Sequence, residues 1–179
     1  TVTVTQTLPN GNFEQGAVVW TEASLQGWNL ILQVNEFPLG VDPRSGSWAT
    51  WLGGDSDEIA YVRQQVQIPS GSPQLKYWHW IDSEDICGFD FGGVVLNSTQ
   101  TVASYDLCIT TNTGGWALRS VDLSAYENQI VTVEIRIETD FQLVSNLYVD
   151  DVLIEYQATP LFAVGFETND TSGWPHSTP

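Results

Sequence analysis

The sequence predicts an all-β fold, a two-sheet antiparallel β-sandwich of the jelly-roll type with β-forming extensions at its termini. Three observations favour this fold class. Apolar and polar residues alternate in many segments, turn-forming glycine and proline separate these segments, and 42% of the residues are hydrophobic while only 15% are charged. Many short alternating segments joined by turns are typical of sandwiches and barrels. The low charge content indicates a folded, globular chain.

The alternation has the period of two that half-buried strands require. Residues 1–7 alternate β-branched side chains without a charge, and in residues 60–68 and 131–137 nearly every second side chain is apolar. Turn signals such as Gly53-Gly54, Gly92-Gly93 and Gly114-Gly115 lie between the alternating segments. Only residues 122–128 are compatible with a helical turn.

The domain organisation follows from length and from a change in composition. A chain of 179 residues is expected to form one domain. After Tyr156 the alternation gives way to Gln-Ala-Thr-Pro, a short apolar stretch and a polar end. We therefore expect an N-terminal strand extension (residues 1–7), the jelly-roll sandwich (residues 8–156) and a C-terminal tail (residues 157–179).

The charge balance restricts the partners. Five basic residues stand against 22 acidic ones, which gives a formal net charge of −17. Nucleic acid is excluded as a partner, because its binding needs a basic surface. Membrane insertion is not expected, because no apolar run approaches the roughly 20 residues that span a bilayer. Cations, neutral glycans and proteins remain as partners.

The two cysteines, Cys87 and Cys108, lie on either side of an expected hairpin. They can be two buried free thiols or a disulfide. We favour the disulfide, because the chain otherwise has the character of an extracellular protein, and disulfides persist in oxidising compartments. No charged and apolar leader precedes Thr1, so we expect a secreted or cell-surface protein whose signal peptide has been removed.

Several short motifs occur in a characteristic order, and together they indicate a family. They are residues 10–14 (Asn-Gly-Asn-Phe-Glu), Gly27-Trp28, residues 45–48 (Ser-Gly-Ser-Trp), 65–69, 75–78, 113–116, 121–126 and 148–152. Residues 8–156 resemble the galactose-binding-like jelly-roll domains of secreted bacterial proteins. That group includes carbohydrate-binding modules attached to xylanases and MAM-like domains attached to secreted peptidases. Residues 160–168 and 171–174 are similar to a short C-terminal motif of secreted bacterial proteins, which implies that the chain is a whole mature protein.

The resemblance implies a structural calcium ion that ties the first strand to the last. Carried over to this sequence, the implied ligands are the Glu14 side chain, the Asn12 carbonyl, the carbonyls of Ser45 and Ser47, and the Asp150 side chain, with Asp151 as the second choice for the last ligand. Calcium takes six to eight oxygen ligands from carboxylates and carbonyls, which this set supplies. In the alternative interpretation, Glu14 caps a turn and the two aspartates form a solvated strand end.

Catalysis is not expected. The two histidines are His79, which lies among aromatic residues and is interpreted as a packing residue, and His176, which lies in the tail. The sequence has no nucleophile elbow, zinc-binding helix or Cys-x-x-Cys pair. The acidic pairs are interpreted as solvated loops, although two carboxylates are also what a glycosidase uses.

The function that we favour from the sequence is that of a structural subunit in a cell-surface or filamentous assembly. β-forming sequence continues beyond the sandwich at both ends, with Thr1, Val2 and Val4 in one segment and Leu161, Phe162 and Phe166 in the other. A terminal strand can add to the sheet edge of a neighbouring subunit, and head-to-tail repetition of that contact gives a polymer. The alternative is that both termini fold back on their own domain.

The alternative function is that of a carbohydrate-binding module. Trp78 and Trp80 share one face of an expected strand, and with Tyr61, Arg63 and Arg136 they would form an aromatic platform for a neutral polysaccharide. Sugars stack their apolar faces on aromatic rings. Tryptophans in a sandwich also fill the core, and the sequence does not show that these strands share a sheet.

Overall fold

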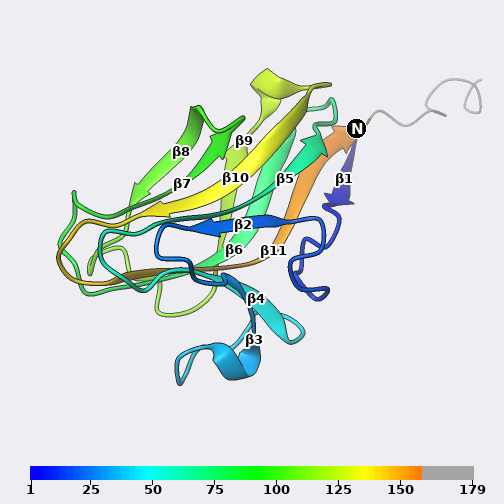
Figure 1. Ribbon diagram of the computed structural model, residues 1–179. Coiled ribbons are helices and arrows are strands. Elements are labelled where there is room, and N and C mark those ends of the chain that lie inside the picture. Colours follow the sequence, from blue (N-terminus) through cyan, green and yellow to red (C-terminus); the bar gives the residue numbers. More distant parts are fainter. Residues whose placement is uncertain (159–179) are drawn as a thin grey trace, which may run out of the picture.

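The computed structural model describes residues 1–158, which form two antiparallel sheets stacked face to face (Figure 1). The six-stranded sheet, here called sheet A, has the order β3-β4-β11-β6-β9, with β1 also paired to β11. The five-stranded sheet, here called sheet B, has the order β2-β5-β10-β7-β8. The predicted all-β sandwich is therefore confirmed.

Sheet A consists of β1 (Val2–Thr7), β3 (Ile31–Gln33), β4 (Trp48–Gly53), β6 (Gln74–Ser83), β9 (Ala117–Asp122) and β11 (Ser145–Ala158). Sheet B consists of β2 (Thr21–Ser24), β5 (Ile59–Gln67), β7 (Phe91–Leu96), β8 (Gln100–Asp106) and β10 (Ile130–Glu138). Two short 3-10 helices are η1 (Val34–Glu36) and η2 (Ser124–Tyr126), and η2 lies where the sequence allowed a helical turn.

The hydrophobic core lies between the sheets and is built from the alternating rows. The inward row of β10 is at most 1% exposed, and it consists of Val131, Val133, Ile135 and Ile137. Sheet A contributes fully buried Leu75 and Tyr77 from β6. Burying one large apolar side chain stabilises the fold by roughly 1.5–3 kcal/mol, so these rows hold the two sheets together.

β11 is the strand on which sheet A is organised. Along one edge it pairs with β6, and along the other it pairs first with β4 and then with β1. The pairing with β6 shifts register between Asp150 and Leu153, and Asp151 has the left-handed backbone angle φ of 50°. Between the ends of β4 and β1, Val152 N–H donates to the Gly11 carbonyl at 2.8 Å. The irregular residues of β11 thus face the loop that follows β1.

The N-terminal strand pairs within its own chain. β1 runs antiparallel to β11, with Val2 opposite Ala158 and Thr7 opposite Leu153 (Figure 1). β11 continues to Ala158, two residues past the sandwich boundary predicted at Tyr156. The other predicted assembly residues, Leu161, Phe162 and Phe166, lie outside the described residues.

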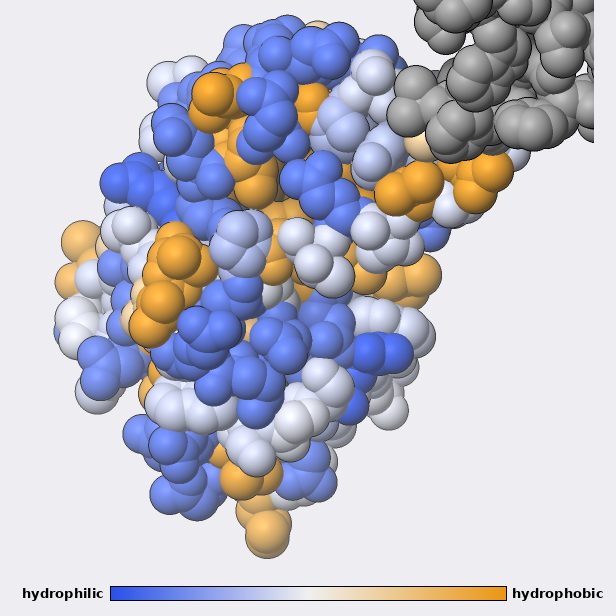
Figure 2. All heavy atoms as spheres, turned by 90° about the vertical axis from the view of Figure 1, so that its right-hand side faces the viewer, coloured by the Kyte–Doolittle hydropathy of each residue, from blue (hydrophilic) through white to orange (hydrophobic). Residues whose placement is uncertain are grey.

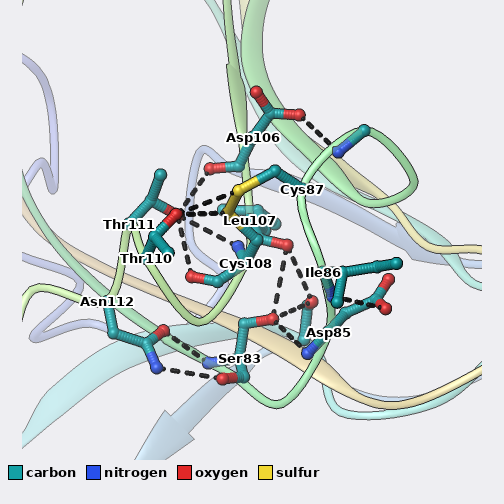
Figure 3. Close-up of a disulfide and its surroundings, with 12 residues drawn as sticks. Ser83, Asp85, Ile86, Cys87, Asp106, Leu107, Cys108, Thr110, Thr111 and Asn112 are labelled. Carbon is teal, nitrogen blue, oxygen red and sulfur yellow. Dashed lines mark hydrogen bonds between the residues drawn. A yellow bond between two sulfur atoms is a disulfide. The ribbon is translucent and has the colours of Figure 1, made fainter.

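Cys87 and Cys108 form the disulfide that the sequence predicted. It links the loop between β6 and β7 to the segment that follows β8 (Figure 3). Two hydrogen bonds join the same segments, from Gly88 N–H to the Asp106 carboxylate at 2.9 Å and from Ile109 N–H to the Asp85 carbonyl at 2.8 Å. Covalent and hydrogen bonds therefore fix this end of the sandwich together.

Within residues 1–158, no helix has the length and apolar character needed to cross a membrane.

Removing the disulfide is expected to lower the free energy of unfolding by about 3 kcal/mol, because the cross-link restricts the unfolded chain. The test is urea unfolding of the double variant Cys87→Ala/Cys108→Ala, followed by tryptophan fluorescence. Reducing agent should shift the wild-type midpoint in the same direction and leave the variant unchanged. Equal midpoints for wild type and variant would contradict this account.

Candidate functional site

The structure places the predicted calcium ligands around one loop, residues 44–47, which precedes β4. Glu14 approaches this loop from the segment after β1, and Asp150 and Asp151 approach it from the irregular part of β11. Asn12 and Asp151 line the same surface hollow, of about 380 Å³. Residues from three distant parts of the sequence therefore meet where the strands at the two ends of the domain are tied together.

The Glu14 side chain binds backbone N–H groups of the loop and of the first residue of β4. One carboxylate oxygen, Oε1, accepts hydrogen bonds from the N–H groups of Ser47 and Trp48, both at 2.9 Å. Gly46 is in the left-handed region with φ of 61°, and a Cβ atom there would lie 2.2 Å from Glu14 Oε1. Only glycine allows the loop backbone to come this close to the carboxylate.

Asp150 is fully buried and binds the same loop. Its oxygens accept hydrogen bonds from Ser45 N–H at 3.0 Å and from Asp151 N–H at 2.7 Å. Burial raises the pKa of Asp150 to about 7, although the Ser45 N–H lowers it. A buried carboxylate of this kind is more stable in its charged form when a cation lies nearby.

Asp151 has a different electrostatic environment, because the guanidinium of Arg44 forms an ion pair with one of its oxygens. Its other oxygen accepts the Ser45 hydroxyl hydrogen at 3.0 Å. Arg44 supplies Asp151 with a positive charge, while within residues 1–158 no ion pair reaches Glu14 or Asp150. Glu14 and Asp150 are therefore better candidates for a calcium ligand than Asp151. Both hydrogen bonds to Glu14 end on Oε1, so its Oε2 remains for an ion, and each Asp150 oxygen accepts one N–H group and keeps a second lone pair.

The predicted sugar platform does not form as one surface. Trp78 and Trp80 lie on the outer face of sheet A, on β6, whereas Tyr61, Arg63 and Arg136 lie on the outer face of sheet B, on β5 and β10. Each of the five side chains lies on the outer face of its own sheet. The two tryptophans are nonetheless separated from Tyr61 and the two arginines by the full thickness of the sandwich, because β6 belongs to sheet A and β5 and β10 belong to sheet B.

Trp78 and Trp80 are half-buried and packed. The Arg44 guanidinium lies 4.1 Å from the ring centroid of Trp78. Trp80 packs edge-on against Trp116 and Tyr148, with ring centroids 6.2 and 6.1 Å apart. These contacts favour a structural role for both tryptophans on sheet A.

The residues on sheet B form an ion-paired group. Arg63 lies over the ring of Tyr61, at 5.0 Å from its centroid, and Arg63 and Arg136 both pair with the buried carboxylate of Glu134, at 3.8 and 3.5 Å. A hollow of about 340 Å³ lies beside Arg136 and is lined also by Phe91, Gly93, Val95, Thr101, Ser104 and Glu138. The arginines therefore already have partners, and the described residues that line the hollow include no tryptophan or tyrosine on which a sugar ring could stack.

A third surface, which the sequence did not identify as a site, combines exposed aromatic area with a hollow. Trp28, in the loop between β2 and β3, is 58% exposed, and with Trp51 of β4 it lines a cleft of about 400 Å³. The Trp51 indole N–H donates to the Asn146 side chain at 2.8 Å, which fixes the ring. Polar side chains at the cleft are those of Asn29, Glu36 and Asp55. We call this the Trp28–Trp51 cleft.

Sequence signals for this cleft were present but unspecific. Trp28 directly follows Gly27, a residue typical of turns and loops. Gly54 lies against the Trp51 ring, and a Cβ atom there would be 2.9 Å from it. The approach of the two tryptophans depends on the pairing of β3 with β4, and a single sequence does not reveal that pairing.

His79 lies on the inner face of β6 and is 4% exposed. Its imidazole lies near Tyr77 and Tyr105, with ring centroids 6.1 and 6.0 Å apart, and near the Arg119 guanidinium, at 3.4 Å. Burial and the positive charge of Arg119 lower the pKa of His79 to about 4, so the ring is neutral at pH 7. This environment is that of a packing histidine.

A scan of family models and a search of curated proteins gave no match. Solved structures share the fold. The carbohydrate-binding module TmCBM61 in complex with β-1,4-galactotriose aligns with a TM-score of 0.61 and 12% identity, over 85% of this chain and 99% of the module.

Two further similar structures have different roles. The K3 cleaved adhesin domain of Lys-gingipain from Porphyromonas gingivalis W83 gives a TM-score of 0.55 and 18% identity, over 86% of this chain and 99% of that domain. The Stig cyclase Fisc from Fischerella sp. TAU gives 0.57 and 11%, over 89% of this chain and 100% of the cyclase.

The chain therefore has the β-sandwich fold of carbohydrate-binding modules and adhesin domains, as its resemblance to galactose-binding-like jelly rolls predicted. At these identities the likeness concerns the fold alone. Because the same fold also serves an enzyme, function has to be argued from the sites of this chain.

Proposed function

We propose that this chain is a non-catalytic, extracellular carbohydrate-binding domain stabilised by calcium, and that a neutral sugar binds in the Trp28–Trp51 cleft. The observation that carries the proposal is the cleft itself, where a 58% exposed tryptophan stands beside a second, fixed tryptophan. A large exposed aromatic side chain in a concave surface marks a binding site.

The chemistry of the cleft suits a sugar. The rings of Trp28 and Trp51 offer apolar faces on which a pyranose ring stacks, and Asn29, Glu36 and Asp55 offer amide and carboxylate groups for its hydroxyls. Its volume of about 400 Å³ lies in the range of small-ligand sites. The acidic side chains favour a neutral sugar over an anionic one.

The proposed calcium ion would bind Glu14 and Asp150, with carbonyl oxygens of the 45–47 loop and of Asn12. The support is the meeting of two carboxylates without ionic partners among the described residues at one close-packed loop. When bound, calcium would supply positive charge to a chain with a net charge of −17 and reduce its self-repulsion.

The extracellular location is supported by the Cys87–Cys108 disulfide, because such bonds persist in oxidising compartments. TmCBM61 is named for a complex with β-1,4-galactotriose, so a β-1,4-galactan is the first polysaccharide to test, beside xylan and cellulose. Each of these ligands is uncharged.

Trp28→Ala is expected to weaken binding to the preferred polysaccharide by tenfold or more, because a stacked aromatic face is lost; this corresponds to about 1.4 kcal/mol. Affinity electrophoresis with each polysaccharide measures the effect. Leu25→Ala is the matched control, since Leu25 lies in the same loop and is 67% exposed. Trp78→Ala should leave the affinity unchanged. The proposal fails if no polysaccharide retards the wild type, or if Trp28→Ala is retarded equally.

A second candidate function is self-association through β1. One edge of β1 pairs with β11, and within residues 1–158 no strand pairs with its other edge. Residues 1–7 contain no charged residue and no proline. Proteins commonly protect such edges with lysine, proline or a bulge, so the unprotected edge favours strand pairing with another copy or exchange of β1 between copies.

Figure 2 views the molecule from the side on which β1 lies. Among its described residues, seen from the right-hand side of Figure 1, hydrophilic side chains predominate and hydrophobic ones form separate small groups (Figure 2). The unpaired edge of β1 offers main-chain hydrogen bonds for association on this side.

Placing lysine on this edge is expected to abolish self-association while β1 stays paired with β11. Thr3 and Thr5 have exposed side chains, and Thr3→Lys removes one exposed hydrogen bond, from the Gln157 side chain, so Thr3→Lys/Thr5→Lys should lower the melting temperature only slightly. Light-scattering mass and negative-stain microscopy measure the assembly, with deletion of residues 1–7 as a second variant. A wild type that stays at 19.8 kDa at every concentration, or lysine variants that still polymerise, would contradict this function.

A further inference from the structure

Three carboxylates meet at the end of the sandwich that carries the disulfide. Asp85 and Asp90 lie in the loop between β6 and β7, and Asp140 lies in the loop between β10 and β11. Each can contribute one oxygen to a group in which all the oxygens lie within 4.8 Å of one another. Asp85 is 3% exposed and Asp90 is fully buried, so the group is largely inside the protein.

Each carboxylate uses only part of its bonding capacity. One oxygen of each, Oδ1, accepts a backbone N–H group, from Ile86, Asp140 and Gln142 respectively, at 2.7 Å in every case. The other oxygens of Asp85 and Asp90 are buried and have no hydrogen-bond partner among the described residues. The Asp85 side chain points away from the Cys87–Cys108 disulfide (Figure 3). Buried polar atoms without a partner are rare in proteins and indicate an unseen ion or water.

Within residues 1–158, no basic side chain forms an ion pair with this group. The chain has five basic residues, and four of them form ion pairs with acidic residues outside this group: Arg44, Arg63, Lys76 and Arg136. The fifth, Arg119, lies over the ring of Tyr105. Buried charges are normally paired or coordinate a metal, because a lone buried charge is costly. Adjacent carboxylates repel one another as well, and a divalent cation among them removes that repulsion.

The group is separate from the proposed Glu14–Asp150 calcium site. Ser145 and Ser83, at one end of the β11–β6 pairing, adjoin the loops that carry the three aspartates, whereas Asp150 lies opposite Trp78. Five residues along a strand correspond to about 16 Å. The two places therefore cannot share one ion.

We propose that Asp85, Asp90 and Asp140 form a second divalent-cation site, which takes calcium and ties the β6–β7 loop to the β10–β11 loop. The hard carboxylate oxygens suit calcium, and carbonyl oxygens and water complete a shell of six to eight ligands. This site is independent of the sugar cleft and of the Glu14–Asp150 site. The competing occupant is a proton, since burial raises the pKa of Asp90.

The test is calcium titration of the full chain by isothermal titration calorimetry at pH 7.5, after removal of bound metal with chelator. The wild type is expected to bind two calcium ions. Asp85→Asn and Asp140→Asn should each bind only the calcium ion of the Glu14–Asp150 site. Glu14→Gln should bind only the calcium ion of the Asp85, Asp90 and Asp140 site. Glu84→Gln, an exposed residue next to Asp85, is the control that should still bind two.

A second measurement keeps the proposal testable if a variant is less stable. In chelator, Asp140→Asn should unfold at the same temperature as the wild type or higher, because one repelling charge is gone. In calcium it should gain less stability than the wild type. The proposal is overturned if Asp85→Asn and Asp140→Asn bind as many calcium ions as the wild type, or if the only calcium ion bound is the one lost in Glu14→Gln.

Discussion

The interruption of strand pairing in the middle of β11 is the constraint on which the rest of sheet A depends. β11 has 14 residues and pairs with both β4 and β1 along the same edge. The change of partner requires an irregular segment between the two pairings. The register shift at residues 150–153 provides it. A hydrogen bond from Val152 to Gly11 fills the gap in the pairing, and the same irregularity directs Asp150 and Asp151 towards the 44–47 loop.

Charge is the second constraint, and it favours the binding of cations by this chain. The chain has 22 acidic and 5 basic residues, so most carboxylates have no cationic side chain to pair with. Several acids are nevertheless buried, among them Glu58, Asp90, Glu134 and Asp150. Glu58 is held by the Ser24 hydroxyl and the Leu25 N–H, both at 2.7 Å, and Glu134 by two arginines. Asp150 accepts hydrogen bonds only from backbone N–H groups. Asp90 accepts one backbone N–H group, and its other oxygen has no partner among the described residues. Both carboxylates can therefore still bind a cation.

The sequence predicted what local periodicity determines. It placed the inward rows of β5 and β10 correctly and put Trp78 and Trp80 on one face of their strand, because facing depends only on alternation along one strand. It could not show that β6 lies in one sheet and β5 and β10 in the other, since sheet membership depends on contacts between distant segments. For the same reason the Trp28–Trp51 cleft and the Asp85, Asp90 and Asp140 group were missed. The disulfide was predicted because two cysteines flank an expected hairpin in a chain with the character of an extracellular protein.

The central claim is that calcium at the Glu14–Asp150 site holds the two ends of the domain together, and thermal unfolding with and without calcium tests it most directly. The wild type should melt at a higher temperature in calcium chloride than in chelator at equal ionic strength. At a free concentration of about 100 times Kd the gain is about 2.7 kcal/mol, or about 5 to 10 °C for a domain of this size. In Glu14→Gln the part of the gain that comes from this site should be lost, and only the gain from the Asp85, Asp90 and Asp140 site should remain. Superimposable melting curves of the wild type in calcium and in chelator would contradict the account.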